Sequence, residues 1–103
     1  RTGATAAIAF DDVTAHGLLA GLSDNGVAVP RDFSVVGCDD VLGAVTQPAL
    51  TTVSNWSVEA GRAAVSLLFD MLQSSAIRDV RYVLETHLVV RDTTGAATPR
   101  QAL

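Results

Sequence analysis

Two pairs of adjacent aspartates are the residues best suited to chemistry in this chain. The pairs at 11–12 and 39–40 each directly follow an apolar run, at residues 6–10 and 33–38. Parallel α/β sheets bind ligands outside the carboxyl ends of their strands, which is where both pairs would lie. We expect the first aspartate of each pair to contact a ligand and the second to cap a helix or brace the fold. For either pair alone a purely structural role is equally open, since aspartate after a strand commonly caps helices and forms turns.

The chemistry of carboxylates narrows the class of ligand. A carboxylate accepts hydrogen bonds from hydroxyl groups, and such charge-assisted bonds are about twice as strong as neutral ones, so a sugar or polyol is a natural partner. Paired carboxylates could instead hold Mg²⁺ for phosphoryl transfer. Folds that do so also use a lysine, and the sequence has neither a lysine nor a phosphate-binding glycine motif. We therefore expect no catalytic residue, no metal and no cofactor, and Mg²⁺-dependent phosphatase activity is the least favoured alternative.

The other reactive side chains give no sign of an enzyme. Cys38 ends an apolar run and is expected in the core, while His16 and His87 share no metal-ligand spacing. We expect His16 to be exposed or interfacial and His87 to face outward from a strand. Trp56, next to Asn55, could stack on a sugar ring or pack against the fold, and both roles stay open.

The composition limits the class of protein. The 103 residues are 49% hydrophobic and 17% charged, and 11 acidic residues against 7 basic ones give a net charge of −4. DNA-binding surfaces need an excess of basic side chains, so direct contact with DNA is not expected. No apolar run approaches the ~20 residues of a membrane span. The single cysteine can form no internal disulfide and is compatible with a reducing compartment.

A strand–helix–strand unit is predicted to position the aspartate pairs. Buried strands are expected at 6–10 and 33–38, because continuous apolar runs are typical of parallel sheets covered on both faces. Between them, residues 13–23 carry apolar side chains at helical spacing, among them Leu18 and Leu22. This order favours a parallel sheet with a right-handed crossover, and therefore an α/β fold.

The second half of the chain is predicted to hold a strand at 50–54 and a long helix at 57–73. Apart from a narrow polar stripe this helix is apolar, over about twice the width that an ordinary surface helix buries. We expect it to be covered from more than one side, which a small lone domain cannot easily supply. Residues 80–84 and 86–91 are predicted as a strand pair or one bent strand, and the unpatterned tail at 93–103 as frayed and disordered.

Four segments resemble the LacI/GalR family of transcriptional regulators, in the family's order and spacing. They are IAFDD with the following Gly17 (8–12), VPRDFSVVGCDD (29–40), PALTTV (48–53) and LVVRDTTG (88–95). Together they cover essentially the whole chain. The resemblance implies a partial periplasmic-binding-protein-like fold of type I, formed by residues 1–92 and incomplete without an N-terminal lobe. It also implies that the helix at 57–73 belongs to that other lobe.

The same resemblance implies a function and partners. In such regulators a small effector, here expected to be a sugar or polyol, binds between two lobes and controls operator binding by a helix-turn-helix headpiece. The implied protein is a cytoplasmic homodimer that touches DNA only through that headpiece, which lies outside this sequence, and touches no membrane. A fragment of the periplasmic sugar-binding protein of a transporter is the alternative, because it shares the fold.

The resemblance also implies roles for individual residues. Asp11, Asp39 and Asn55 match positions that line the effector cleft, with Trp56 beside them. Asp11 stands where the family usually has Asn, and a carboxylate can only accept hydrogen bonds. The implied dimer interface comprises His16, Leu19, Ala20, Val41 and Val45.

Overall fold

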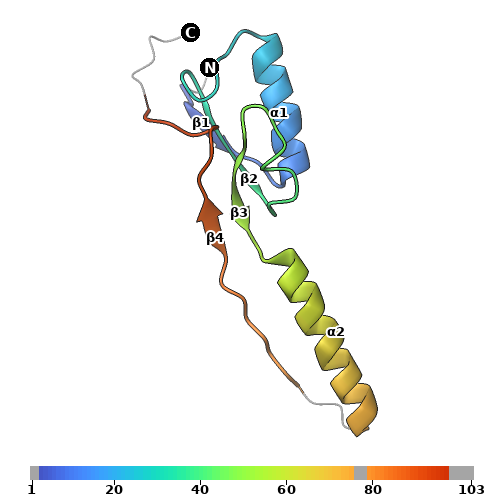
Figure 1. Cartoon of the computed structure of the whole chain (residues 1–103). Coiled ribbons are helices and arrows are strands. Elements are labelled where there is room, and N and C mark those ends of the chain that lie inside the picture. Colours follow the sequence, from blue (N-terminus) through green and yellow to red (C-terminus); the bar gives the residue numbers. More distant parts are fainter. Residues whose placement is uncertain (1–2, 76–78, 98–103) are drawn as a thin grey trace.

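A computed structural model describes residues 3–75 and 79–97 (Figure 1). The elements follow in the order β1 (Ala6–Ile8), α1 (Asp12–Asp24), β2 (Ser34–Cys38), β3 (Thr51–Ser54), α2 (Ser57–Ser74) and β4 (His87–Val89). The four strands form one sheet in the order β1-β2-β3-β4, in which β1, β2 and β3 are parallel and β4 is antiparallel to β3. The predicted α/β class and parallel β-α-β unit are confirmed.

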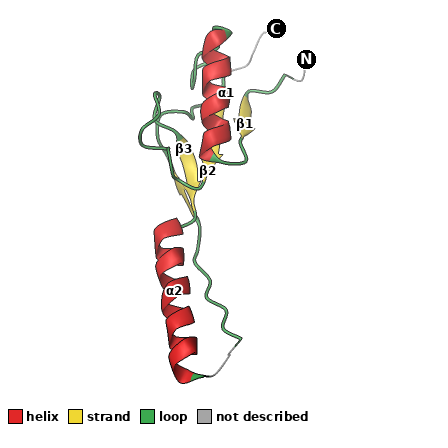
Figure 2. Ribbon diagram, turned by 90° about the vertical axis from the view of Figure 1, so that its right-hand side faces the viewer, coloured by secondary structure: helices red, strands yellow, loops and turns green. Residues whose placement is uncertain are grey.

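The core lies between α1 and one face of the sheet. The buried apolar side chains are Ala15 and Leu19 on α1, Val35 on β2, and Leu50 just before β3. Figure 2 shows α1 lying along the sheet as the single helix of this part of the molecule. One covering helix buries only alternate strand residues, because successive side chains of a strand point to opposite faces.

The face of β1 that points away from α1 is exposed, which differs from the prediction that the first two strands are buried on both faces. Ile8 is 81% exposed and Phe10 is 88% exposed. On β2, Cys38 is half-buried, whereas it was expected in the core. The physical reason is that the described residues supply no second helical layer for this face.

The helix α2 projects away from the sheet (Figures 1 and 2). None of its residues is buried, although the predicted helix is confirmed in position and length. The returning segment at 79–86 runs beside it and, with α2, lines a groove of about 380 Å³. The radius of gyration is 18.7 Å, against about 13 Å for a compact domain of 100 residues. Within the described ranges neither helix is long and apolar enough to cross a bilayer.

The C-terminal segment differs from two expectations. Residues 80–84 form no strand, because β3 pairs with β2 on one side and with β4 on the other, and the described chain places no strand beside 80–84. Thr93 is fully buried, where a frayed tail was expected. Its hydroxyl donates to the Val35 carbonyl at 2.7 Å and accepts from the Thr51 amide at 2.8 Å. The rest of the predicted tail, from 98, lies outside the described residues.

Candidate functional site

Asp39 and Asn55 meet at the carboxyl ends of β2 and β3. The Asp39 amide continues the β2–β3 ladder by donating to the Val53 carbonyl at 2.8 Å. The Asp39 backbone then turns to a left-handed φ of 95°, and the Asn55 side-chain amide donates to Asp39 Oδ1 at 2.5 Å. Both side chains are half-buried. Two of the residues predicted for the effector cleft are therefore in direct contact.

Trp56 lies directly after Asn55, where the chain leaves the sheet for α2. Its backbone is also left-handed, with a φ of 53°, and its side chain makes no cap hydrogen bond to the helix. The indole ring is tilted by 32° against the His87 ring, with centroids 4.6 Å apart, and Trp56 remains 42% exposed. His87 is exposed on β4 as expected, but sequence reasoning did not foresee this contact. It arises because β4 pairs antiparallel with β3 and sets His87 opposite Ser54.

Asp11 caps α1. Its Oδ1 accepts the Thr14 backbone amide at 2.7 Å, which occupies one of the two carboxylate oxygens. Hydrogen bonds from the side chain and the backbone of Thr14 lower the pKa of Asp11 from its ordinary value of 3.8. Capping or bracing is predicted for the second aspartate of each pair, whereas in the structure the first aspartate, Asp11, caps the helix. Contact between Asp11 and a ligand stays a prediction.

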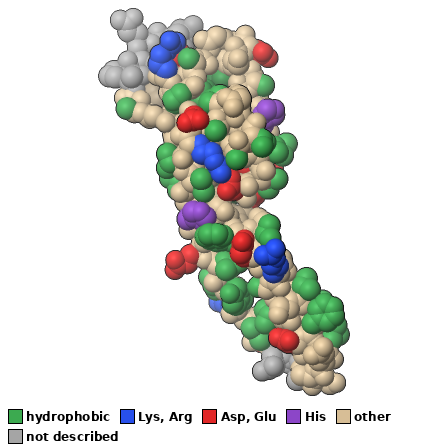
Figure 3. Space-filling model, viewed as in Figure 1, with side chains coloured by type: hydrophobic (Ala, Val, Ile, Leu, Met, Phe, Trp, Pro, Cys, Tyr) green, Lys and Arg blue, Asp and Glu red, His purple; other side chains and the backbone are tan. Residues whose placement is uncertain are grey.

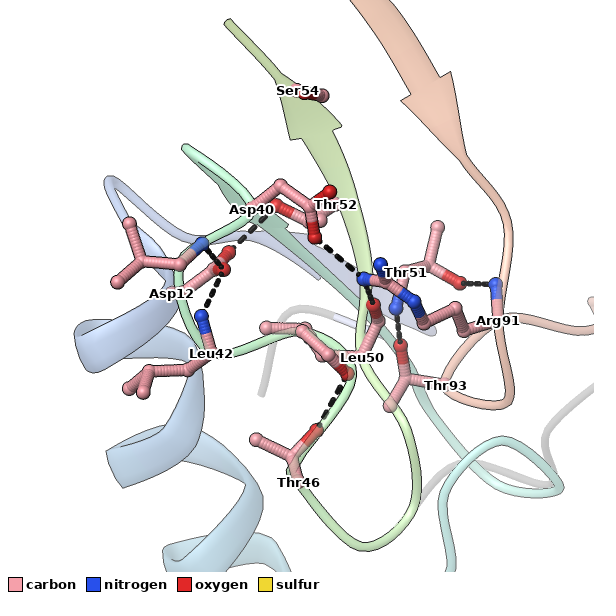
Figure 4. A network of polar contacts seen from close by, with 12 residues as sticks. Asp12, Asp40, Leu42, Thr46, Leu50, Thr51, Thr52, Ser54, Arg91 and Thr93 are labelled. Carbon is pink, nitrogen blue, oxygen red and sulfur yellow. Dashed lines mark hydrogen bonds and ion pairs between the residues drawn. The ribbon is translucent and has the colours of Figure 1, made fainter. Parts of the chain in front are cut away.

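Asp12 braces the fold from inside, as predicted for the second aspartate of a pair. It is 1% exposed. Its Oδ2 accepts the amides of Val41 and Leu42 at 2.8 and 3.0 Å, and its Oδ1 accepts the Thr52 hydroxyl at 2.6 Å (Figure 4). Asp12 thus ties the start of α1 to the loop after Asp40 and to the central strand β3.

The second pair is braced in the same way by a residue that sequence reasoning missed. Arg91 forms an ion pair with Asp40 at 2.8 Å and donates to the Leu50 carbonyl at 3.0 Å. Both charged side chains are largely buried, at 20% and 24% exposed. A Cβ at Gly43 would collide with the guanidinium, so only glycine lets the loop pass this close. In the sequence, Arg91 stands out only as part of the LVVRD segment, and nothing in that segment indicates that Asp40 is its partner.

The residues predicted for a dimer interface divide into two groups. His16 and Ala20 are exposed on α1, and Val41 and Val45 are 69% and 76% exposed on the loop after Asp40. Leu19 is only 7% exposed and packs in the core with Ala15, so it offers little surface to a second copy. Helical spacing shows that Leu19 lies on an apolar face of the helix, but it does not show whether the chain's own sheet or a second copy covers that face.

The arrangement suits binding through hydrogen bonds. At the carboxyl edge of the sheet it offers a carboxylate, a carboxamide and a partly exposed indole within a few residues of one another. Over residues 3–75 and 79–97 no three His, Cys, Asp or Glu side chains gather as a metal site. Figure 3 shows hydrophobic side chains over the surface of both the sheet part and the α2 part. Such exposed apolar surface marks contact sites for further protein.

Comparison with known proteins identifies the class. Residues 2–94 match the periplasmic binding protein-like domain family. The chain is 38% identical over 87 residues to the HTH-type transcriptional regulator RegA of Clostridium saccharobutylicum, covering 84% of this chain and 26% of that protein. The chain thus spans about a quarter of the length of this relative.

Two solved structures share the fold over most of the chain. The transcriptional regulator CelR in complex with cellobiose has a TM-score of 0.80 and 35% identity, over 88% of this chain and 28% of that one. A LacI family regulator from Enterococcus faecium with bound ribose has a TM-score of 0.86 and 29% identity, over 97% of this chain and 36% of that one. The fold is therefore part of the periplasmic-binding-protein-like architecture.

The chain belongs to the periplasmic-binding-protein-like domain family. Within it, the chain is part of the effector-binding domain of a LacI-type transcriptional regulator. The relatives compared above are regulators of transcription and not enzymes.

Proposed function

We propose that this chain senses a sugar-like effector at the Asp39–Asn55 pair and forms part of a dimer contact. The observation that carries the proposal is the hydrogen bond between these side chains, made where β2 and β3 end at the carboxyl edge of the parallel strands. Ligands of such sheets bind at this edge. The carboxylate accepts from sugar hydroxyls, the Asn55 amide adds a donor and an acceptor, and the Trp56 ring offers an apolar face.

The relatives support the class of effector. CelR was solved with cellobiose and the Enterococcus faecium regulator with ribose, and they match 88% and 97% of this chain. Asp11 lies at the same sheet edge, after β1, and contributes its second carboxylate oxygen to the effector. The effector is therefore a saccharide or another polyol.

The partners follow from the exposed surfaces. A second copy of the chain docks on His16, Ala20, Val41 and Val45, which all remain accessible. The helix α2, which buries no residue here, belongs to the neighbouring lobe and packs against its sheet. The effector then controls a DNA-binding headpiece in the cytoplasm. This chain has a net charge of −4 and makes no contact with DNA itself.

Calorimetric titration with cellobiose and ribose tests the proposal. The titrated protein is a polypeptide of the relatives' length that contains residues 1–103. Asp39→Ala is expected to reduce saccharide affinity by about a hundredfold, because hydrogen bonds to a charged group contribute roughly 1.5–3 kcal/mol each. Asp24→Ala, which removes an exposed carboxylate at the far end of α1, is the control and is expected to leave the affinity unchanged. Equal affinity in the parent and Asp39→Ala contradicts the assignment.

A further inference from the structure

Two consecutive residues of the candidate site hold an unfavourable backbone conformation. Asp39 and Asp40 have φ values of 95° and 56°, in the left-handed region that side chains with a Cβ rarely adopt. Aspartate tolerates this region better than most residues, but such a pair persists only where surrounding contacts hold it in place. The contacts that hold this pair come from two different directions.

The first contact comes from α1. The buried carboxylate of Asp12 accepts the amides of Val41 and Leu42, the two residues that follow the strained pair. Its other oxygen is anchored by the Thr52 hydroxyl of β3. The loop therefore cannot move away from the sheet without breaking bonds to a buried charge, which is a costly group to leave unsatisfied.

The second contact comes from the segment after β4. The guanidinium of Arg91 bridges the Asp40 carboxylate and the Leu50 carbonyl, and the Arg91 amide is itself held by the Thr51 hydroxyl at 2.9 Å. Figure 4 shows Arg91 reaching in from this segment while Asp12 reaches in from the opposite side. The strained pair is thus fixed between two anchored side chains.

We propose that Asp12 and Arg91 are positioning residues that preorganise the effector site. By holding the backbone of Asp39 and Asp40 left-handed, they keep the Asp39 carboxylate turned toward Asn55 before any ligand arrives. Neither residue needs to touch the effector. The role of Asp39 as an effector ligand rests on the proposed function, whereas the positioning of its carboxylate does not. Preorganisation of this kind raises affinity because the ligand need not order the loop.

The direct test follows the Asn55 side-chain amide by NMR in the 103-residue chain. Arg91→Gln removes the ion pair, and Asp40→Asn removes it from the other side while keeping a residue that tolerates the left-handed region. In both variants the Asn55 Nδ2 resonances are expected to move toward those of a solvent-exposed asparagine, and in Arg91→Lys to stay near the parental position. Arg31→Gln, which breaks the exposed Arg31–Asp32 pair, is the matched control and is expected to leave them unmoved.

The outcomes separate positioning from a merely structural role. Unchanged Asn55 resonances in folded Asp40→Asn or Arg91→Gln overturn the proposal. So does an equal movement in the Arg31→Gln control. If Arg91→Gln does not fold, Asp40→Asn alone decides, because it changes one side chain that is 24% exposed without altering its size.

A calorimetric arm distinguishes this inference from the proposed function. In a chain of the relatives' length, Asp40→Asn is expected to weaken cellobiose or ribose binding at least about fivefold, and Arg31→Gln to leave it unchanged. If the parent binds no saccharide, the proposed function fails while the NMR result still decides the positioning role. If the parent binds and Asp40→Asn binds equally well, preorganisation by this ion pair is refuted.

Discussion

Replacing Asp12 by asparagine tests whether one buried carboxylate holds three parts of the fold together. The side chain is 1% exposed and accepts three hydrogen bonds, from two loop amides and one strand hydroxyl. Asparagine has nearly the same shape but no charge and only one acceptor oxygen. That oxygen can still accept the hydrogen bonds from the Val41 and Leu42 amides, and the new NH₂ group then faces the Thr52 hydroxyl.

The expected cost is worked from these bonds. A hydrogen bond to a charged group contributes roughly 1.5–3 kcal/mol and a neutral one roughly 0.5–1.5 kcal/mol, a difference of about 1 kcal/mol per bond. Two retained amide bonds therefore lose about 2 kcal/mol of unfolding free energy in total. Asp12→Ala leaves all three hydrogen-bond donors without an acceptor. It is expected to lower the free energy of unfolding by about 4 kcal/mol, since each buried unsatisfied group costs roughly 1–3 kcal/mol.

Urea unfolding followed by far-UV circular dichroism at pH 7 measures the effect. With a denaturant dependence of roughly 2 kcal/mol/M for a chain of this size, Asp12→Asn lowers the urea midpoint by about 1 M. Asp24→Asn, an exposed change in the last turn of the same helix, is the control. It is expected to be neutral or slightly stabilising, because a negative charge near a helix C-terminus is unfavourable. A midpoint for Asp12→Asn equal to that of Asp24→Asn refutes the reasoning.

Four further substitutions probe the stability of the fold. His87→Ala removes the stacked ring, and the single tryptophan is expected to emit at longer wavelength with a loss of about 1 kcal/mol in stability, measured by fluorescence-detected unfolding. Thr14→Val removes a hydroxyl bond to Asp11 and is expected to raise the carboxyl pKa toward 3.8 in an NMR titration. Because the folded-state pKa is lowered, this bond stabilises the fold above pH 3.8 and is lost as the pH falls through the lowered value, so the variant loses less stability on acidification. Gly37→Ala sets a Cβ against the Asp12 carboxylate and the Leu50 side chain and is expected to cost about 2 kcal/mol in thermal unfolding. Gly17→Ala, in open space on α1, is expected to stabilise the fold by about 0.5–1 kcal/mol.

The helices and strands with a clear pattern of apolar residues could be predicted from the sequence. Helical spacing placed α1 and α2 within one or two residues of their bounds, and apolar runs placed β1 and β2. Residues 80–84 were wrongly predicted as a strand, because β-branched residues favour extended structure whether or not a neighbouring strand exists to pair with. Pairing depends on the fold around the segment, which local pattern does not contain.

The candidate site could be predicted only in part. The sequence pattern places Asp39 at the carboxyl edge of the parallel strands, whereas Asn55 enters the predicted site only through the family resemblance, and the structure shows that the two are in contact. The Arg91–Asp40 ion pair joins residues 51 positions apart (91 − 40) and depends on the loop that Gly43 allows, so no local signal could have found it. Leu19 shows the converse limit, because an apolar helical position fits a core and an interface equally well.

The central claim is that Asp39 and Asn55 bind a saccharide at the carboxyl edge of the sheet. A crystal structure of a chain of the relatives' length, grown with cellobiose or ribose, tests it most directly. The account predicts a saccharide hydroxyl within hydrogen-bonding distance of the Asp39 carboxylate, with the Asp39 and Asp40 backbone still left-handed. A saccharide bound elsewhere, with Asp39 facing only Asn55 and water, contradicts it.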